Sequence, residues 1–211
     1  MKRAVLCLLV VASAVSATTL SGALTVDNGF NLYLSTSPNQ IGTWINTGDN
    51  WQTAYPFSGP ALTPGTTYYL QVDATNRADG SGSTYQWGAF LGNFTLSDSL
   101  FQFANGGQSL NTNTTDWTYA YTGFDAATLQ PAGYALNGGG IWGSNMGHPV
   151  SGIDTNAQWI WDANAYNYGP ELYFEAEITP VGSPVPEPTP LILLGVALVA
   201  LGLIERLKRS T

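Results

Sequence analysis

The chain has very little cysteine, histidine or positive charge, and each shortage removes a class of function. Its single cysteine, Cys7, lies in an apolar stretch near the start, so the rest of the chain has no basis for disulfides or thiol chemistry. His148 is the only histidine, and no Gly-x-Ser-x-Gly motif accompanies it. The sequence therefore supports neither a Ser-His-Asp triad nor a histidine-based zinc site.

Positive charge is confined almost entirely to the two ends. The six basic residues are Lys2, Arg3, Arg77, Arg206, Lys208 and Arg209. Residues 18–188 hold thirteen of the fourteen acidic residues against Arg77 alone, which gives a net charge of −12. Phosphate groups are bound by clustered Lys and Arg, so we expect neither nucleic acid nor anionic lipid as a partner.

The first 17 residues have the layout of a secretory signal peptide. A basic start at Lys2 and Arg3 precedes the apolar run 4–11, and small residues follow at 12–14 and 15–17. This order predicts a signal helix that is cleaved after Ala14 or Ala17. The alternative, a short buried N-terminal helix, is disfavoured by the basic start and by the two small-x-small sites. Cys7 would leave with the signal peptide.

The C-terminal residues predict a short membrane segment. A proline-rich linker at 183–190 precedes the apolar run 191–204, and a basic tail follows at 205–211. As a helix, 191–204 is about 21 Å long, less than the roughly 30 Å of a bilayer core. Flanking basic side chains that snorkel make spanning feasible. A weak or temporary transmembrane anchor therefore fits better than a buried helix, which would not be apolar on all sides.

The end of the chain resembles a known sorting signal. Pro186, Glu187 and Pro188 stand before the apolar segment and the basic cluster, in the order of the PEP-CTERM family. The resemblance covers about the last 27 residues. It implies recognition and processing by an exosortase, a transient stay in the inner membrane, and delivery to the outer surface or biofilm matrix of a Gram-negative bacterium.

Residues 18–182 predict a single all-β domain. Apolar residues alternate in several runs, each separated from the next by Gly-, Asn- or Pro-rich turns. The runs include Phe30, Leu32 and Leu34, and also Leu172, Phe174, Ala176 and Ile178. Short strands between turns are typical of a β-sandwich or jelly roll. A helical turn is expected only at 126–129.

Four segments of this body resemble galactose-binding-like jelly rolls. They are residues 27–34, residues 63–76, residues 88–92 and residues 156–161, where the last contains Trp159-Ile160-Trp161. The resemblance covers about two thirds of the body and implies a jelly-roll β-sandwich. The sequence departs from the family pattern at Ser35, Thr36 and Ser37, where an Asn-Gly turn is usual.

Loop tryptophans are the residues best suited to hold a sugar. Trp44, Trp51 and Trp142 lie in turn-rich stretches beside Asn and Asp, and sugar rings stack on flat aromatic faces. Burial in the core is the alternative for each of them, and at least one is expected to be exposed. Trp159 and Trp161, two positions apart, are expected on the same, core-facing side of a strand.

Three oxygen-bearing side chains are candidates for a structural calcium ion. Asp27, Asp154 and Asn156 offer the ligands that calcium prefers, and the implied jelly rolls often hold this ion. Their spacing matches no diagnostic calcium loop. No other cofactor is expected.

Glu175 and Glu177 form the one carboxylate pair with spacing suited to catalysis. Two positions apart on a strand, they share a face at a separation of roughly 6–7 Å. Some glycosidases use carboxylates about 5–10 Å apart. The simpler interpretation is a soluble outer face opposite Phe174.

The sequence as a whole favours an exported, non-enzymatic protein of the cell surface or biofilm matrix that binds carbohydrate. Two alternatives stay open at this point. One is a purely structural matrix subunit without a specific ligand, and the other is a glycoside-active enzyme that uses Glu175 and Glu177.

Overall fold

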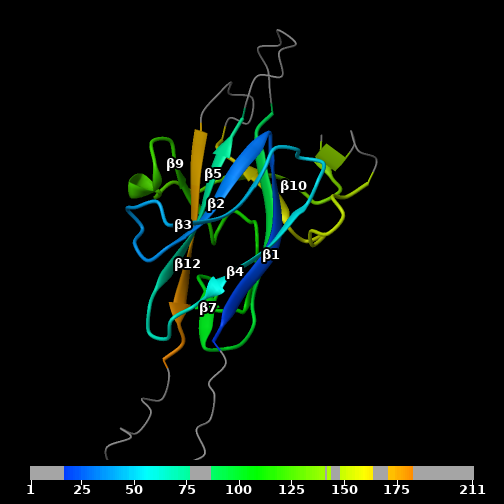
Figure 1. The fold of residues 1–211 in the computed structure, drawn as a ribbon. Coiled ribbons are helices and arrows are strands. Elements are labelled where there is room, and N and C mark those ends of the chain that lie inside the picture. Colours follow the sequence, from blue (N-terminus) through cyan, green and yellow to red (C-terminus); the bar gives the residue numbers. More distant parts are fainter. Residues whose placement is uncertain (1–16, 77–86, 141, 144–147, 164–170, 183–211) are drawn as a thin grey trace, which may run out of the picture.

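The chain folds into two antiparallel sheets packed face to face (Figure 1). The computed structural model describes residues 17–76, 87–140, 142–143, 148–163 and 171–182. Sheet A has the order β10 (Ala132–Leu136), β11 (Gln158–Trp161), β6 (Ala89–Leu96), β1 (Thr19–Asp27) and β4 (Tyr55–Ala61), with β8 (Ser109–Asn111) beside β6. Sheet B has the order β3 (Thr43–Gly48), β2 (Gly29–Ser35), β5 (Tyr68–Thr75), β12 (Glu171–Pro180) and β7 (Phe101–Phe103), with β9 (Thr118–Ala120) also on β12. A 3-10 helix, η1 (Phe124–Ala126), follows β9.

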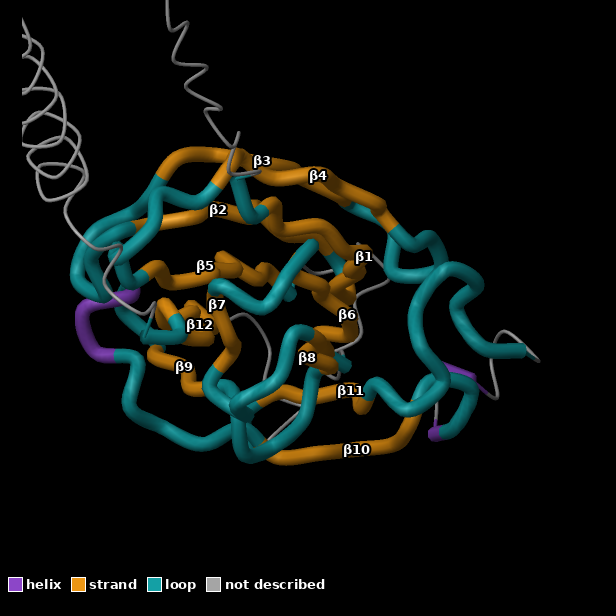
Figure 2. Tube along the Cα trace, turned by 90° about the horizontal axis from the view of Figure 1, so that it is seen from below, coloured by secondary structure: helices purple, strands orange, loops and turns teal. Residues whose placement is uncertain are grey.

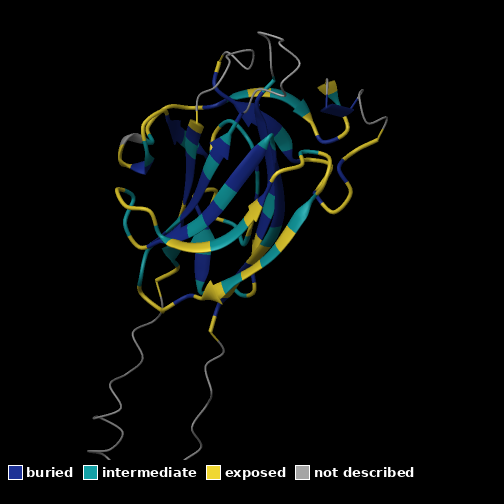
Figure 3. Cartoon of the chain, turned by 45° about the horizontal axis from the view of Figure 1, so that its top comes forward, coloured by how far each residue is buried: buried dark blue, intermediate teal, exposed yellow. Residues whose placement is uncertain are grey.

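The prediction of an all-β sandwich is confirmed, and the alternation in β12 shows why it succeeds. Leu172, Phe174, Ala176 and Ile178 are all at most 2% exposed and point into the space between the sheets. Phe174 packs there against Phe90 of the opposite sheet, with ring centroids 5.2 Å apart. A strand that buries one face needs an apolar residue at every second position, which is the pattern that the sequence carries. In Figure 3 the central strands are accordingly mostly dark blue, whereas the edge strands β3 and β4 and many loops are teal and yellow.

The helical turn lies slightly earlier than expected. Residues 126–129 were predicted to form it, whereas η1 covers Phe124–Ala126. Phe124 is 4% exposed and packs edge-on against Tyr173 of β12, with ring centroids 5.2 Å apart. The contact with sheet B, and not local helix propensity, accounts for the position of the turn.

β3 and β4 close one side of the sandwich. They belong to different sheets but run side by side, as Figure 2 shows, and the Asn46 side chain donates a 3.2 Å hydrogen bond to the Pro56 carbonyl. Ile45 of β3 turns inward and packs on the core between the sheets. Trp44, its neighbour, turns outward and is 56% exposed. This corner therefore places an aromatic side chain at the molecular surface.

A second, smaller core covers the outer face of sheet A. Trp159 of β11 is fully buried there, and Trp142 stacks on it with ring centroids 5.1 Å apart and an interplanar angle of 19°. The chain between β10 and β11 supplies this cover. Asn137 holds it in place, because its side chain donates to the carbonyls of Val150 (3.1 Å) and Ile153 (2.9 Å) and accepts from the Val150 N–H (2.8 Å).

Candidate functional site

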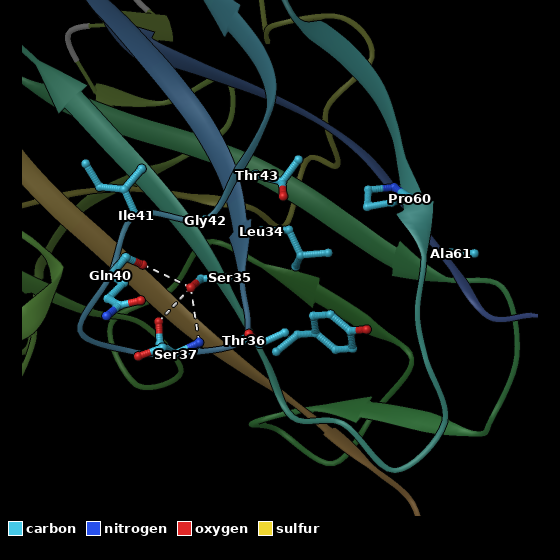
Figure 4. A pocket seen from close by; sticks show the side chains of 11 residues that line it. Leu34, Ser35, Thr36, Ser37, Gln40, Ile41, Gly42, Thr43, Pro60 and Ala61 are labelled. Carbon is cyan, nitrogen blue, oxygen red and sulfur yellow. Dashed lines mark hydrogen bonds between the residues drawn. The ribbon is translucent and has the colours of Figure 1, made fainter.

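A hollow of about 520 Å³ opens at one end of the sandwich, beside β3 (Figure 4). Leu34 and Thr43 lie on one side of it, and Pro60 with Ala61 lies on the other. Its lining comprises Leu34, Ser35, Thr36, Ser37, Gln40, Ile41, Gly42, Thr43, Pro60, Ala61 and Tyr68. Hydroxyl and amide groups thus surround an apolar floor. Ala61 pairs with Thr19 and Tyr68 pairs with Ile178, so the hollow lies at the end where β1 begins and β12 ends.

The segment 36–42, which we call the rim loop, forms the wall of this hollow. Its turn is closed by Ser35, whose hydroxyl lies 2.8 Å from the Ser37 carbonyl and 2.9 Å from the Gln40 carbonyl. At Gly42 only a glycine fits, since a Cβ atom would lie 2.1 Å from the Leu34 carbonyl oxygen. The loop therefore returns close against β2 before the chain enters β3.

Gln71 of β5 connects the rim loop to sheet B. Its side-chain carbonyl accepts a 3.1 Å hydrogen bond from the Gly42 N–H, and its amide nitrogen lies 3.1 Å from the Gln40 carbonyl. The same nitrogen donates a 3.0 Å hydrogen bond to the Glu175 carboxylate of β12. Gln71 is fully buried, so bulk water does not compete for these hydrogen bonds.

Glu175 is the most perturbed acid on this side of the molecule. It is 7% exposed, although the strand pattern placed it on a soluble face. Burial raises its pKa to about 7, against the lowering effect of the hydrogen bond from Gln71, and the nearby charge of Glu177 adds to the rise. The interpretation of both glutamates as a solvated face is therefore wrong for Glu175, because Gln71 covers it, and holds for the exposed Glu177.

The two glutamates share a recess of about 270 Å³ on the outer face of sheet B. Its other lining residues are Tyr69, Ala104, Thr115, Asp116, Thr118 and Ala176. Cross-strand pairing continues this face along one row: Trp44 pairs with Tyr33, Tyr33 with Gln71, and Gln71 with Glu175. The exposed tryptophan and the buried carboxyl thus belong to one surface, about three strand spacings or 14 Å apart.

The three loop tryptophans have different environments. Trp44 is 56% exposed and is available to a ligand. Trp51 is half-buried, and its ring packs edge-on against Trp159 with centroids 6.5 Å apart. Trp142 is only 2% exposed, so the interpretation of this residue as a sugar contact is wrong. Its position in a Gly-rich stretch did not show that the stretch folds over sheet A and needs an apolar anchor.

Trp159 and Trp161 are both fully buried, as expected, but they do not share a side. Trp159 belongs to the outer core on sheet A, whereas Trp161 packs between the sheets, with its ring 5.7 Å from that of Phe174. Trp161 is the last residue of β11, and strict alternation no longer holds where a strand ends.

The structure does not assemble the proposed calcium site. Asp154 binds the backbone N–H of Asn156 at 2.8 Å and contacts Asn93 through its own N–H at 3.3 Å. Asp27 lies at one end of the β1–β6 ladder, opposite Ala89, which is four residues or about 13 Å from Asn93 in the middle of β6. Among the described residues, no group of three acidic, histidine or cysteine side chains is arranged to hold a metal ion.

Asp27 instead contributes to the tryptophan-rich outer core. Its carboxylate accepts a 3.1 Å hydrogen bond from the indole N–H of Trp142 and another, at 2.9 Å, from the Asn28 side chain. Burial raises its pKa to about 6, and the bond from Trp142 partly opposes this rise.

The predicted signal peptide and sorting tail, with Pro186, Glu187 and Pro188, lie outside the described residues. In the part of the chain that the structure covers, no helix is long and apolar enough to cross a bilayer. His148 lies at the surface, with its ring 3.0 Å from the Pro149 carbonyl.

Comparison with known proteins adds no relative. No protein-family model matches the chain, and neither curated protein sequences nor solved structures give a significant match.

Sequence reasoning missed the hollow and Gln71. Gln71 occupies an outward position of a strand, where polar residues are ordinary, so its burial leaves no local signal. The Ser35, Thr36 and Ser37 stretch, which departs from the jelly-roll pattern, was the one available indication of an unusual loop.

Proposed function

We propose that this protein is exported to the outer surface or extracellular matrix of a Gram-negative bacterium and binds a carbohydrate there without cleaving it. The observation that carries the proposal is the exposed Trp44, which follows the lining residue Thr43 at a hollow that presents hydroxyl and amide groups beside apolar side chains. An exposed indole offers a flat apolar face to the C–H groups of a sugar ring. Ser, Thr and Gln side chains offer hydrogen bonds to its hydroxyls.

The size and charge of the site fit a short, non-anionic segment of a polysaccharide. A volume of about 520 Å³ is within the range of small-ligand sites. All six basic residues lie outside the described part of the chain, whereas eleven acids lie within it, that is, all except Asp79, Glu187 and Glu205. An acidic domain of this kind repels uronic acids, sulfated sugars and nucleic acids, so neutral sugars are the favoured class.

The strand pairing supports a jelly roll as the finer fold. β3 runs beside β4, β2 pairs with β5, and β1 pairs with β6, so successive strands fold back on one another as a nested set. Two sheets built from such nested pairs are the architecture of jelly rolls. This fold hosts many functions and does not by itself select carbohydrate.

A glycan array probed with the full-length protein tests the binding proposal. A detergent without a sugar headgroup should be used, so that it does not occupy the site. We expect retention on neutral glycans, and loss of at least 10-fold in affinity in Trp44→Ala. Leu136→Ala is the matched control, because Leu136 is 53% exposed on β10, the far edge of sheet A. If no glycan is retained, the purely structural matrix subunit replaces this proposal. If a glycan is retained and Trp44→Ala binds it as the wild type does, Trp44 and the hollow beside it are not the binding site.

Export and sorting form a separate part of the proposal. The basic start, the apolar run 4–11 and the small residues before position 18 support a signal peptide, and Pro186, Glu187 and Pro188 support exosortase processing. Replacing these three residues by alanine should leave an unprocessed, membrane-held form in the native host. Membrane fractionation with an antibody to the body decides the question, since release equal to that of the wild type contradicts the sorting role.

Glycoside cleavage is a second candidate, favoured by one observation. Glu175, with its pKa raised to about 7, lines the same recess as Glu177. The Cα atoms of two residues on one strand face are about 6.6–7 Å apart. This is near the separation of the two carboxyl groups in inverting glycosidases. Incubation with neutral polysaccharides and detection of reducing ends test this. Product formation by the wild type that disappears in Glu177→Gln would establish the enzyme reading.

A further inference from the structure

We propose that Gln71 and Glu175 are positioning residues that hold the rim loop, and with it the wall of the hollow, in place. This inference concerns regulation of the site under Proposed function and in part rests on it. The rim loop supplies five of the eleven lining residues of the hollow: Thr36, Ser37, Gln40, Ile41 and Gly42. Its shape therefore determines the shape of the hollow.

The contacts of Gln71 explain why a single side chain can hold the loop. Its two polar atoms contact the returning limb of the turn through the Gly42 N–H and the Gln40 carbonyl, and its nitrogen lies 3.5 Å from the Ser37 carbonyl on the outgoing limb. The Glu175 carboxyl accepts a 3.0 Å hydrogen bond from the amide nitrogen, which leaves the amide oxygen to accept from the Gly42 N–H. Rotating the amide by half a turn would set the Gly42 N–H against an NH₂ group and break the contact.

Ionisation of Glu175 is costly while the loop is closed. Its carboxylate is buried, and the Gln71 nitrogen that it contacts at 3.0 Å also lies 3.1 Å from the Gln40 carbonyl oxygen of the loop. The titratable groups that share this face or recess are also acidic: Glu177 and Tyr173 of β12, Tyr69 and Asp73 of β5, Tyr33 of β2, and Asp116 before β9. None of them supplies a positive charge. The ionised carboxylate therefore gains most from water, which it reaches when Gln71 and the loop move away.

The direction of the pH effect follows from linkage. Burial is the largest cause of the raised pKa, about 7 with the loop closed, and opening lowers the pKa toward the ordinary value of a glutamate. The closed loop binds the proton more tightly, so a rise in pH through about 7 favours the open loop. If the pKa falls by about one unit on opening, the open fraction rises about tenfold at high pH.

Hydrogen exchange of the full-length protein without ligand tests the inference independently of sugar binding. Protection factors for residues 36–42, corrected for the intrinsic pH dependence of exchange, should fall about tenfold between pH 5.5 and pH 8.5, while those of β5 change much less. In Glu175→Gln the rim loop should keep the protection it has at low pH across the whole range. Glu171→Gln, an exposed acid of the same strand, should behave as the wild type does.

Gln71→Met removes the amide but keeps the length of the side chain. We expect low rim-loop protection at every pH in this variant and several-fold weaker glycan binding than in the wild type. A pH-independent rim loop in the wild type, an opposite slope, or the same slope in Glu175→Gln overturns the inference even if Gln71→Met does not fold. If rim-loop protection depends on pH as expected but no glycan is retained, only the binding proposal is contradicted. If a glycan is bound but rim-loop protection does not depend on pH, only the positioning role is contradicted.

Discussion

The two outer faces of this sandwich are both covered, but by different kinds of contact. On sheet A the cover is apolar, because Trp142 stacks on Trp159 over a small second core. On sheet B the cover near the hollow is polar, because Gln71 connects the rim loop to the carboxyl of Glu175. The indoles themselves do not titrate, and Asp27, the carboxyl bonded to Trp142, has a pKa of about 6. The hydrogen-bonded carboxyl of Glu175 has a pKa of about 7.

This difference shows which face is suited to ligand binding. Separating the packed rings on sheet A would expose a large apolar area to water, so this cover acts as part of the fold. A loop held by a few hydrogen bonds opens at lower cost and leaves the core between the sheets intact. The adjustable face is also the one beside the exposed Trp44 and the hollow.

The largest expected effect is on the sheet A side. Trp159→Ala removes a fully buried indole and leaves a cavity under Trp142, so it should lower the free energy of unfolding by about 3–5 kcal/mol. Chemical denaturation at pH 6 measures this. A loss below about 1 kcal/mol would show that the second core is not part of the cooperative fold.

Removing the anchor of the same cover should cost less. Asn137→Ala leaves the Val150 N–H and the Val150 and Ile153 carbonyls without their partner in a buried setting, at a cost of about 2–3 kcal/mol. Thermal melting compares this variant with Asn105→Ala, a change at an exposed turn. Equal melting temperatures would mean that water replaces the Asn137 side chain without loss.

On the sheet B side the effect should depend on pH. Glu175 is protonated in the folded protein and ionised in the unfolded chain between about pH 4.5 and pH 7, so its contribution to stability is present at low pH and lost as the pH rises. Glu175→Gln should therefore stabilise the protein by about 2 kcal/mol at pH 8 and have little effect at pH 4.5.

Urea unfolding across this pH range measures the difference. Asp27, on the sheet A side, has a pKa of about 6, so the stability of Glu175→Gln should still depend on pH, but less than that of the wild type. Adding Asp27→Asn to this variant should remove the remaining dependence. Destabilisation of Glu175→Gln at pH 8 would contradict the assignment of a costly buried charge.

The smallest expected effect on stability is at the exposed corner. Trp44→Ala should change the free energy of unfolding by less than about 0.5 kcal/mol, because the ring is 56% exposed. The same melting series with Trp159→Ala sharpens the contrast between the faces. A loss above about 2 kcal/mol at Trp44 would make it a structural residue and remove the aromatic platform from the site.

Part of this arrangement was predictable from the residues in order. The strands with strict alternation were predicted, because a strand that buries one face carries an apolar residue at every second position. That pattern is visible within the segment itself. β12 is the clearest case, with four inward positions at most 2% exposed. The first strand, β1, was missed, because both its faces are partly buried and Ala23, Leu24, Thr25 and Val26 run without alternation.

The candidate site was predictable only in pieces. At least one of the three tryptophans is exposed, as expected, namely Trp44, but the same argument was applied to Trp142, which is buried. Both lie in polar, turn-rich stretches, and nothing local distinguishes the edge strand β3, which carries Trp44, from a segment that folds onto a sheet. Asp27 and Asp154 were grouped by chemistry, whereas the β1–β6 register places Asp27 about 13 Å along the strands from Asn93, the residue that contacts Asp154.

The sequence by itself determined the class of fold, the acidic character of the body and the expected signals at the two ends, because composition and periodicity are properties of short segments. Only the tertiary structure decided which aromatic rings are buried and which carboxyl is protonated near neutral pH. Burial and pKa depend on what covers a side chain, and Gln71, which bonds to the Glu175 carboxyl, lies 104 positions away in the sequence.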